Sequence, residues 1–97
     1  MKVSGKYNKF SKHALHRMFS RGITPEDVAT VCRVHEVIKE YPEDKPYPSR
    51  LILGIAGKRP LHVVIADVPE TEERIIITVY EPDEMKWDDA FQERKKQ

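Results

Sequence analysis

The hydrophobic period changes once along the chain, and this change limits the folds that its 97 residues can form. From residue 11 to 33, apolar residues recur at helical spacing. From residue 36 to 81, they alternate or form short runs between turns that contain Gly or Pro. The first pattern predicts two helices, and the second predicts strands over 36–41, 50–56, 60–67 and 74–81. Because the connections between these strands are short, we expect an antiparallel meander.

Capping residues set the bounds of both predicted helices. Ser11 is a suitable N-cap for a helix that ends near residue 21, and Gly22 suits the left-handed position after it. Thr24, Pro25 and Asp27 are typical of the start of a second helix with a capping box. Only two or three residues separate the two helices, which predicts a helical hairpin.

A polar helix is predicted for residues 83–97, after the last strand. The expected fold class is therefore α+β: an N-terminal helical hairpin, a four-stranded antiparallel sheet and a C-terminal helix. The length suits one domain, 1–97. No apolar leader and no apolar run of about 18 residues occur, and the single cysteine, Cys32, excludes an intrachain disulfide. We therefore expect a cytoplasmic protein that makes no use of a membrane.

Charge is distributed unevenly, although the formal net charge is only +1. Residues 1–24 contain six Lys or Arg and no Asp or Glu. A second acid-free block, residues 45–66, contains Lys45, Arg50, Lys58 and Arg59. If the two blocks merged on one surface, that surface would attract a polyanion through counterion release. A nucleic acid is therefore the predicted kind of partner.

The first predicted helix is amphipathic, with a basic outer side. Its apolar stripe, which we expect to face the core, consists of Ala14, Leu15, Met18 and Phe19. The side chains expected on the opposite side are His13, His16, Arg17, Ser20 and Arg21.

His13 and Arg17 are four residues apart and therefore neighbours on the helix surface. A histidine can exchange a proton near neutral pH, and an arginine can hold a phosphate with its planar fork of donors. Such a pair suits metal-independent RNA cleavage, in which a base takes the 2′-hydroxyl proton and cations stabilise the charged phosphorane. The structural alternative is that His13 bonds locally in the first turn and that Arg17 pairs with Glu81.

Further site candidates lie on the third and fourth predicted strands. His62 lies on the third predicted strand, just after Arg59, although its apolar neighbours on the same face favour a structural histidine. Tyr80 could stack a base, and Glu81 could orient a histidine or an arginine. The predicted catalytic residues are His13, Arg17 and Glu81. The predicted substrate-binding residues are Arg21, Arg59, His62 and Tyr80.

Two short motifs offer a zinc site as an alternative. His13 with His16 and Cys32 with His35 would supply four ligands at helical spacing. Cys32, however, falls on the apolar side of the second helix and is predicted to lie in the core. We therefore expect neither a metal nor a cofactor.

Several segments of the chain resemble the DUF4258 family. "SKHALHRMFSRGITPEDV" is similar to its opening HA-x-x-R-M-x-x-RGI-[ST]-x-E-x-V, and "EVIKEYPEDKPYPSRLILG", "RPLHVVIA" and "ITVYEPDEMKW" resemble its later blocks. That family in turn resembles the RelE/BrnT-type toxins, small α+β proteins that cleave RNA and are silenced by an antitoxin.

The resemblance implies the toxin component of a type II toxin–antitoxin pair, a metal-independent endoribonuclease. Its partner would be a cognate antitoxin, which carries a zinc-finger segment in MqsR–MqsA-like pairs. The alternative is a non-catalytic module that binds nucleic acid or a protein through the same basic face. A catalytic site requires His13, Arg17 and Glu81 to converge in one cleft, whereas a binding module requires only a basic surface.

Overall fold

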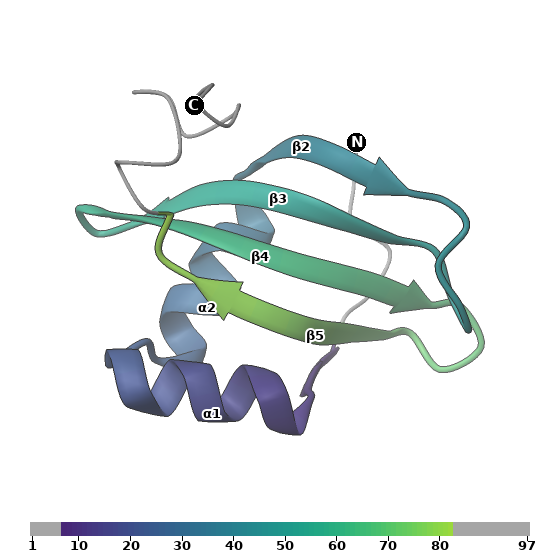
Figure 1. Ribbon diagram of the computed structural model, residues 1–97, viewed down its shortest axis with the longest axis horizontal. Coiled ribbons are helices and arrows are strands. Elements are labelled where there is room, and N and C mark those ends of the chain that lie inside the picture. Colours follow the sequence, from purple (N-terminus) through teal and green to yellow (C-terminus); the bar gives the residue numbers. More distant parts are fainter. Residues whose placement is uncertain (1–6, 83–97) are drawn as a thin grey trace, which may run out of the picture.

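A computed structural model describes residues 7–82 of the chain (Figure 1). The four strands predicted from periodicity are present to within one residue at each end, and both helices are present. The helix predicted for residues 83–97 lies outside the described residues. The elements in chain order are β1 (Tyr7–Phe10), α1 (Lys12–Arg21), α2 (Pro25–Arg33), β2 (Glu36–Tyr41), β3 (Ser49–Ala56), β4 (Arg59–Val68) and β5 (Glu73–Tyr80).

The five strands form one mixed sheet in the order β1-β5-β4-β3-β2. Strands β2 to β5 pair antiparallel, but β1 pairs parallel to β5, with Phe10 opposite Ile76. The prediction of a four-stranded antiparallel sheet that follows a helical hairpin is therefore wrong. The physical reason is that β1 has only four residues, too few for a period, and its partner lies near the other end of the described chain.

Ser11 joins β1, α1 and β5. Its backbone N–H donates to the Ile76 carbonyl at 3.0 Å, and its hydroxyl donates to the Ile77 carbonyl at 2.8 Å. The same hydroxyl oxygen accepts a hydrogen bond from the Ala14 N–H at 2.9 Å, which caps α1 as predicted. One residue thus fixes the point at which the chain leaves the sheet and the helix begins.

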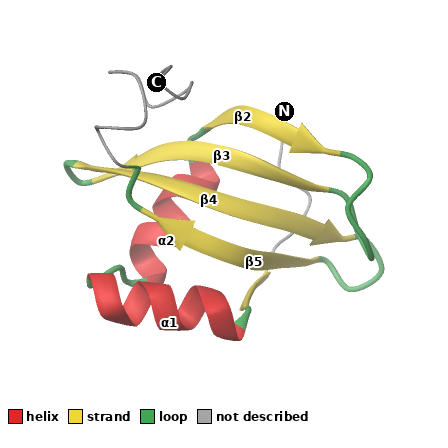
Figure 2. Cartoon of the chain, viewed as in Figure 1, coloured by secondary structure: helices red, strands yellow, loops and turns green. Residues whose placement is uncertain are grey.

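Both helices begin at the predicted N-caps and α1 ends at the predicted Gly22, but each helix packs on the sheet instead of forming a hairpin. Gly22 adopts a φ of 67° after α1, and Thr24 with Asp27 completes the capping box of α2. α1 contacts β5, whereas α2 contacts β3. Residues of both helices share one core cluster with β3, β4 and β5, so both cover the same face of the sheet (Figure 2).

The core between helices and sheet is aliphatic. The buried members of the core are Ala14, Met18, Ile23, Val28, Val31, Cys32, Ile52, Ala56, Leu61, Val63, Ile65, Ile76 and Val79.

Neither of the described helices is long and apolar enough to cross a membrane.

Helix α2 approaches β3 most tightly at Gly54. A Cβ atom at this position would lie 2.8 Å from Val31 Cγ1 and 2.9 Å from the Val34 carbonyl oxygen. Because the carbonyl belongs to the backbone, α2 would have to shift to accommodate any side chain. Gly54 therefore sets the distance at which α2 covers the sheet.

Candidate nucleic-acid interface

The seven predicted site residues fall in three places in the fold. His13, Arg17 and Arg21 are on α1. Arg59 and Glu81 meet at the C-terminal end of α1, and His62 and Tyr80 lie on the face of the sheet opposite the helices.

Arg59, at the start of β4, binds the end of α1. Its Nη1 donates to the Gly22 carbonyl and its Nη2 to the Arg21 carbonyl, both at 3.0 Å. Nη2 also lies 3.1 Å from Glu81 Oε1, so Glu81 pairs with Arg59 rather than with Arg17. Carbonyls at a helix C-terminus lack helical partners, and the helix dipole favours a cation there. This geometry gives Arg59 and Glu81 a structural role. They hold the C-terminal end of α1 at the start of β4 and the end of β5.

His62 and Tyr80 form a pair across β4 and β5. His62 Nδ1 lies 3.1 Å from Tyr80 Oη, and the two rings meet edge to face with centroids 5.2 Å apart. His62 is fully buried. Since Leu61 and Val63 point into the helical core, strand alternation places His62 on the opposite face. The sheet therefore separates this pair from α1.

His13 and Glu81 lie near opposite ends of α1. Glu81 shares Arg59 with the Arg21 carbonyl, and His13 precedes Arg21 by eight residues. At a rise of about 1.5 Å per residue, the separation along the helix axis is roughly 12 Å. Proton transfer through a hydrogen bond or one water requires a much shorter distance. The structure therefore does not bring His13, Arg17 and Glu81 into one cleft.

The outer side of α1 is basic and lacks acidic side chains. Lys12, His13, His16 and Arg21 are exposed, and Arg17 is partly exposed. No Asp or Glu occurs between residues 7 and 25. We call these five side chains the basic helix surface.

The buried side of α1 is narrower than the sequence predicts. Ala14 and Met18 are buried, but Leu15 is 50% exposed and Phe19 is 91% exposed. The reason is that α1 packs on β5, next to the edge strand of the sheet, so that only a narrow strip of the helix faces the core. Leu15 and Phe19 therefore border the basic helix surface.

The second acid-free block contributes less positive charge than expected. Arg50 Nη2 lies 2.9 Å from Asp67 Oδ2, and Arg59 forms an ion pair with Glu81. Both acids lie outside the block in sequence and reach these arginines through strand pairing. Arg59 does meet the first block at the end of α1, but both arginines are paired with acids and add little net charge to the positive surface on α1.

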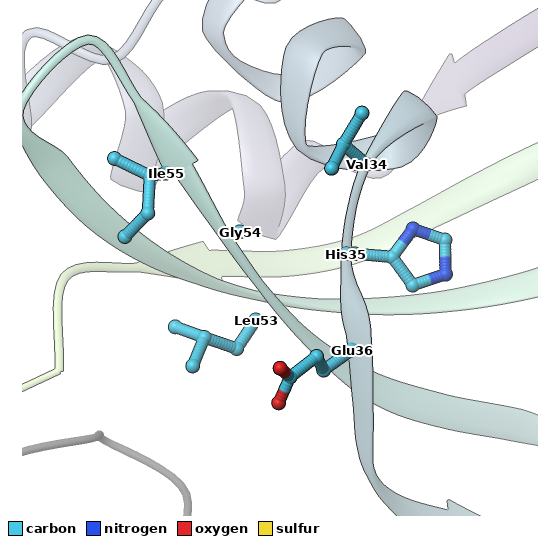
Figure 3. A pocket seen from close by; sticks show the side chains of 6 residues that line it. All are labelled: Val34, His35, Glu36, Leu53, Gly54 and Ile55. Carbon is cyan, nitrogen blue, oxygen red and sulfur yellow. The ribbon is translucent and has the colours of Figure 1, made fainter.

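A pocket of about 270 Å³ opens between the end of α2, the start of β2 and the end of β3. His35 Nδ1 lies 3.1 Å from the carbonyl oxygens of Val31 and Cys32, so its ring caps α2. Figure 3 shows this ring directed away from Leu53 and Ile55. The pocket therefore gathers aliphatic side chains more than reactive groups. Its lining residues are Val34, His35, Glu36, Leu53, Gly54 and Ile55.

Cys32 lies in the core, as predicted, and is 3% exposed. Burial raises the pKa of the Cys32 thiol, while the positive charge of Arg74 and a hydrogen bond with its side chain act in the opposite direction. Within residues 7–82, no three His, Cys, Asp or Glu side chains are grouped so that they could hold a metal ion.

The raised pKa of Cys32 makes stability depend on pH. The unfolded chain loses the thiol proton at the ordinary pKa of 9.0, whereas the folded chain retains it to higher pH. The stabilising contribution of the protonated thiol is therefore complete below pH 9.0. It is lost as the pH rises from there through the raised pKa of the folded chain. We expect Cys32→Ala to lower the free energy of unfolding by about 1–3 kcal/mol at neutral pH, and this difference to shrink above pH 9. Urea unfolding of the wild type and of Cys32→Ala, from neutral pH to above pH 9, measures this difference in the free energy of unfolding. A difference that stays constant with pH would contradict the raised pKa of Cys32.

Substitutions of Arg59 and Glu81 test the structural role of this pair. Arg59→Ala removes three hydrogen bonds and should lower the free energy of unfolding by about 1–2 kcal/mol. Glu81→Ala leaves both helix carbonyls bound and should cost less than about 1 kcal/mol, since the ion pair is partly exposed. Thermal or urea unfolding of the single and double variants provides the comparison. A larger effect of Glu81→Ala would show that the carboxylate, and not the helix end, is the main partner of Arg59.

The range matched by a known family covers all of these features. The family DUF4258, described as a domain of unknown function, matches residues 10–81. Comparisons with curated proteins and with solved structures find no match. The matched range includes both helices, strands β2 to β5 and every predicted site residue. Because it spans most of the chain, this protein belongs to the DUF4258 family.

Proposed function

We propose that this protein binds RNA through the basic helix surface. The observation that supports the proposal is the absence of Asp and Glu from residues 7–25, which contain Lys9, Lys12, Arg17 and Arg21. The other 78 residues carry 13 Lys or Arg and 16 Asp or Glu, so positive charge is concentrated in this segment. A local concentration of cations binds a polyanion by releasing its counterions, whatever the net charge of the protein.

The fold presents hydrogen-bond donors of the basic helix surface at regular intervals. Ser11 fastens the start of α1 to β5, and Arg59 fastens its end to β4. His13, Arg17 and Arg21 follow one another every four residues, with about 5–6 Å between the Cβ atoms of neighbours. A fixed row of donors at this spacing suits the repeated phosphates of a nucleic-acid backbone.

RNA cleavage is a second, finer proposal, and the neighbouring side chains of His13 and Arg17 support it. His13 would exchange a proton, and Arg17 would hold the phosphate. Because Glu81 is engaged by Arg59, the second proton-transfer group would be His16, one turn along α1 from His13. The resemblance to RelE/BrnT-type and MqsR-like toxins leads to this proposal. An antitoxin partner and a cytoplasmic location belong to it.

Titration of a fluorescent single-stranded RNA at several salt concentrations tests the binding proposal. The logarithm of the association constant should fall linearly with that of the salt concentration, by about 0.7 for each phosphate neutralised. Lys12→Gln and Arg17→Gln should each lower this slope by about 0.7 and weaken binding to all sequences alike. Arg33→Gln on α2 is the matched control and should leave the slope unchanged. Absence of binding at low salt would refute the proposal.

The same RNA, incubated with EDTA and analysed on a gel, tests cleavage. If the protein cuts, His13→Ala should reduce the rate about 10²–10⁴-fold. Because His13 is exposed, the melting temperature of the His13→Ala variant should equal that of the wild type. RNA that is bound but remains intact would refute cleavage and leave the binding proposal in place.

A further inference from the structure

Phe19 is almost fully in water, although it is a large apolar side chain. It is 91% exposed, whereas Met18 beside it is 3% exposed. At 100° per residue, Phe19 lies about 100° from Met18 and 140° from Ala14, the two residues through which α1 enters the core. A phenylalanine ring buries roughly 150–250 Å² when it finds a partner. The part of the chain that the structure describes leaves this ring exposed, so it is available to a ligand.

The neighbours of Phe19 are mostly cationic or polar. His16 precedes it by three residues and Leu15 by four, so both lie next to it on the helix surface. Lys12 lies two turns away on nearly the same line, within about 20° of Phe19 around the helix axis. No acidic side chain occurs along this helix. The ring, with Leu15 beside it, is therefore a small apolar surface at the border of the basic helix surface.

We infer that Phe19 stacks on an unpaired base of the bound RNA, and this inference rests on the RNA binding proposed above. Proteins that bind single strands combine a cationic track for the backbone with aromatic rings on which bases stack. Surfaces for protein partners instead expose contiguous apolar patches of several hundred square ångströms. Here Leu15, half-exposed, is the apolar side chain next to the ring. The combination favours a nucleotide over an apolar protein surface.

The inference makes single-stranded RNA the substrate class. In a duplex the bases are stacked on one another inside the helix, so that their faces cannot reach Phe19. The cations on α1 would still contact phosphates of a duplex. Duplex RNA should therefore bind through charge alone and more weakly than a single strand of equal length.

Fluorescence anisotropy with three RNAs of equal length separates stacking from charge: a single strand, a duplex and a strand in which abasic sites replace the bases. Phe19→Ala should weaken binding of the single strand about 5- to 150-fold, the effect expected when one base loses its stacking partner. It should leave the affinity for the abasic strand and the duplex unchanged. Because Phe19 contacts no phosphate, the salt dependence should keep its slope.

Two further variants distinguish a flat ring from apolarity alone. Phe19→Trp keeps a stacking surface and should bind the single strand at least as well as the wild type. Phe19→Leu keeps an apolar side chain without a ring and should be as weak as Phe19→Ala. Tyr7→Ala removes an aromatic ring that is 66% exposed on β1 and serves as the control, with unchanged affinity expected. The melting temperatures of all Phe19 variants should match that of the wild type, since the side chain is in water.

The outcomes separate this inference from the binding proposal on which it rests. If the wild type binds RNA with a steep salt dependence but Phe19→Ala and Phe19→Leu bind equally well, stacking is refuted and binding through α1 stands. If Phe19→Leu binds like the wild type while Phe19→Ala does not, the ring is an apolar contact and stacking is again refuted. If the wild type binds no RNA at low salt, both are refuted, and Phe19 with Leu15 would be a contact for a protein partner.

Discussion

The hydrogen bonds of Ser11 determine where α1 lies, and the position of the basic helix surface depends on them. Its N–H and hydroxyl bind two successive carbonyls of β5, and its oxygen caps the helix. Pairing of β1 with β5 brings the chain to this point. Arg59 then holds the last carbonyls of the helix from β4. The helix α1 is therefore held at both ends and lies beside β5 (Figure 1).

The narrow contact between α1 and the sheet leaves most of the helix surface available. Ala14 and Met18 are its buried residues, while α2 packs on β3 against Gly54. A helix that enters the core through so few side chains can carry cations and an exposed ring elsewhere at little cost to stability. The part of the protein that we propose to bind RNA is thus the part that the core uses least.

Local patterns in the sequence predicted local features well. The caps at Ser11, Gly22 and Thr24 depend on hydrogen bonds or dihedral angles within a few residues, and each lies where it was predicted. The bounds of β2 to β5 likewise follow from period and turn residues. The core location of Cys32 follows from its place on the apolar side of α2.

Features that join distant segments could not be predicted in the same way. The parallel pairing of β1 with β5 and the ion pair of Arg59 with Glu81 link residues far apart in sequence. The same limit applies to the candidate site. The expected proximity of His13 and Glu81 depended on contacts between distant segments. Helical periodicity predicts that Phe19 faces the core, but it does not reveal how many strands a helix will cover.

The most direct test of the account is to map where RNA touches the protein. A single-stranded RNA that contains 4-thiouridine would be crosslinked by light to the full chain, and the crosslinked peptides identified after trypsin digestion. Cleavage after Arg17 and Arg21 yields the peptide 18–21, which contains Phe19, and we expect the crosslinks there. Crosslinks confined to His62, within the peptide 59–74 and on the opposite face of the sheet, would contradict RNA binding through α1.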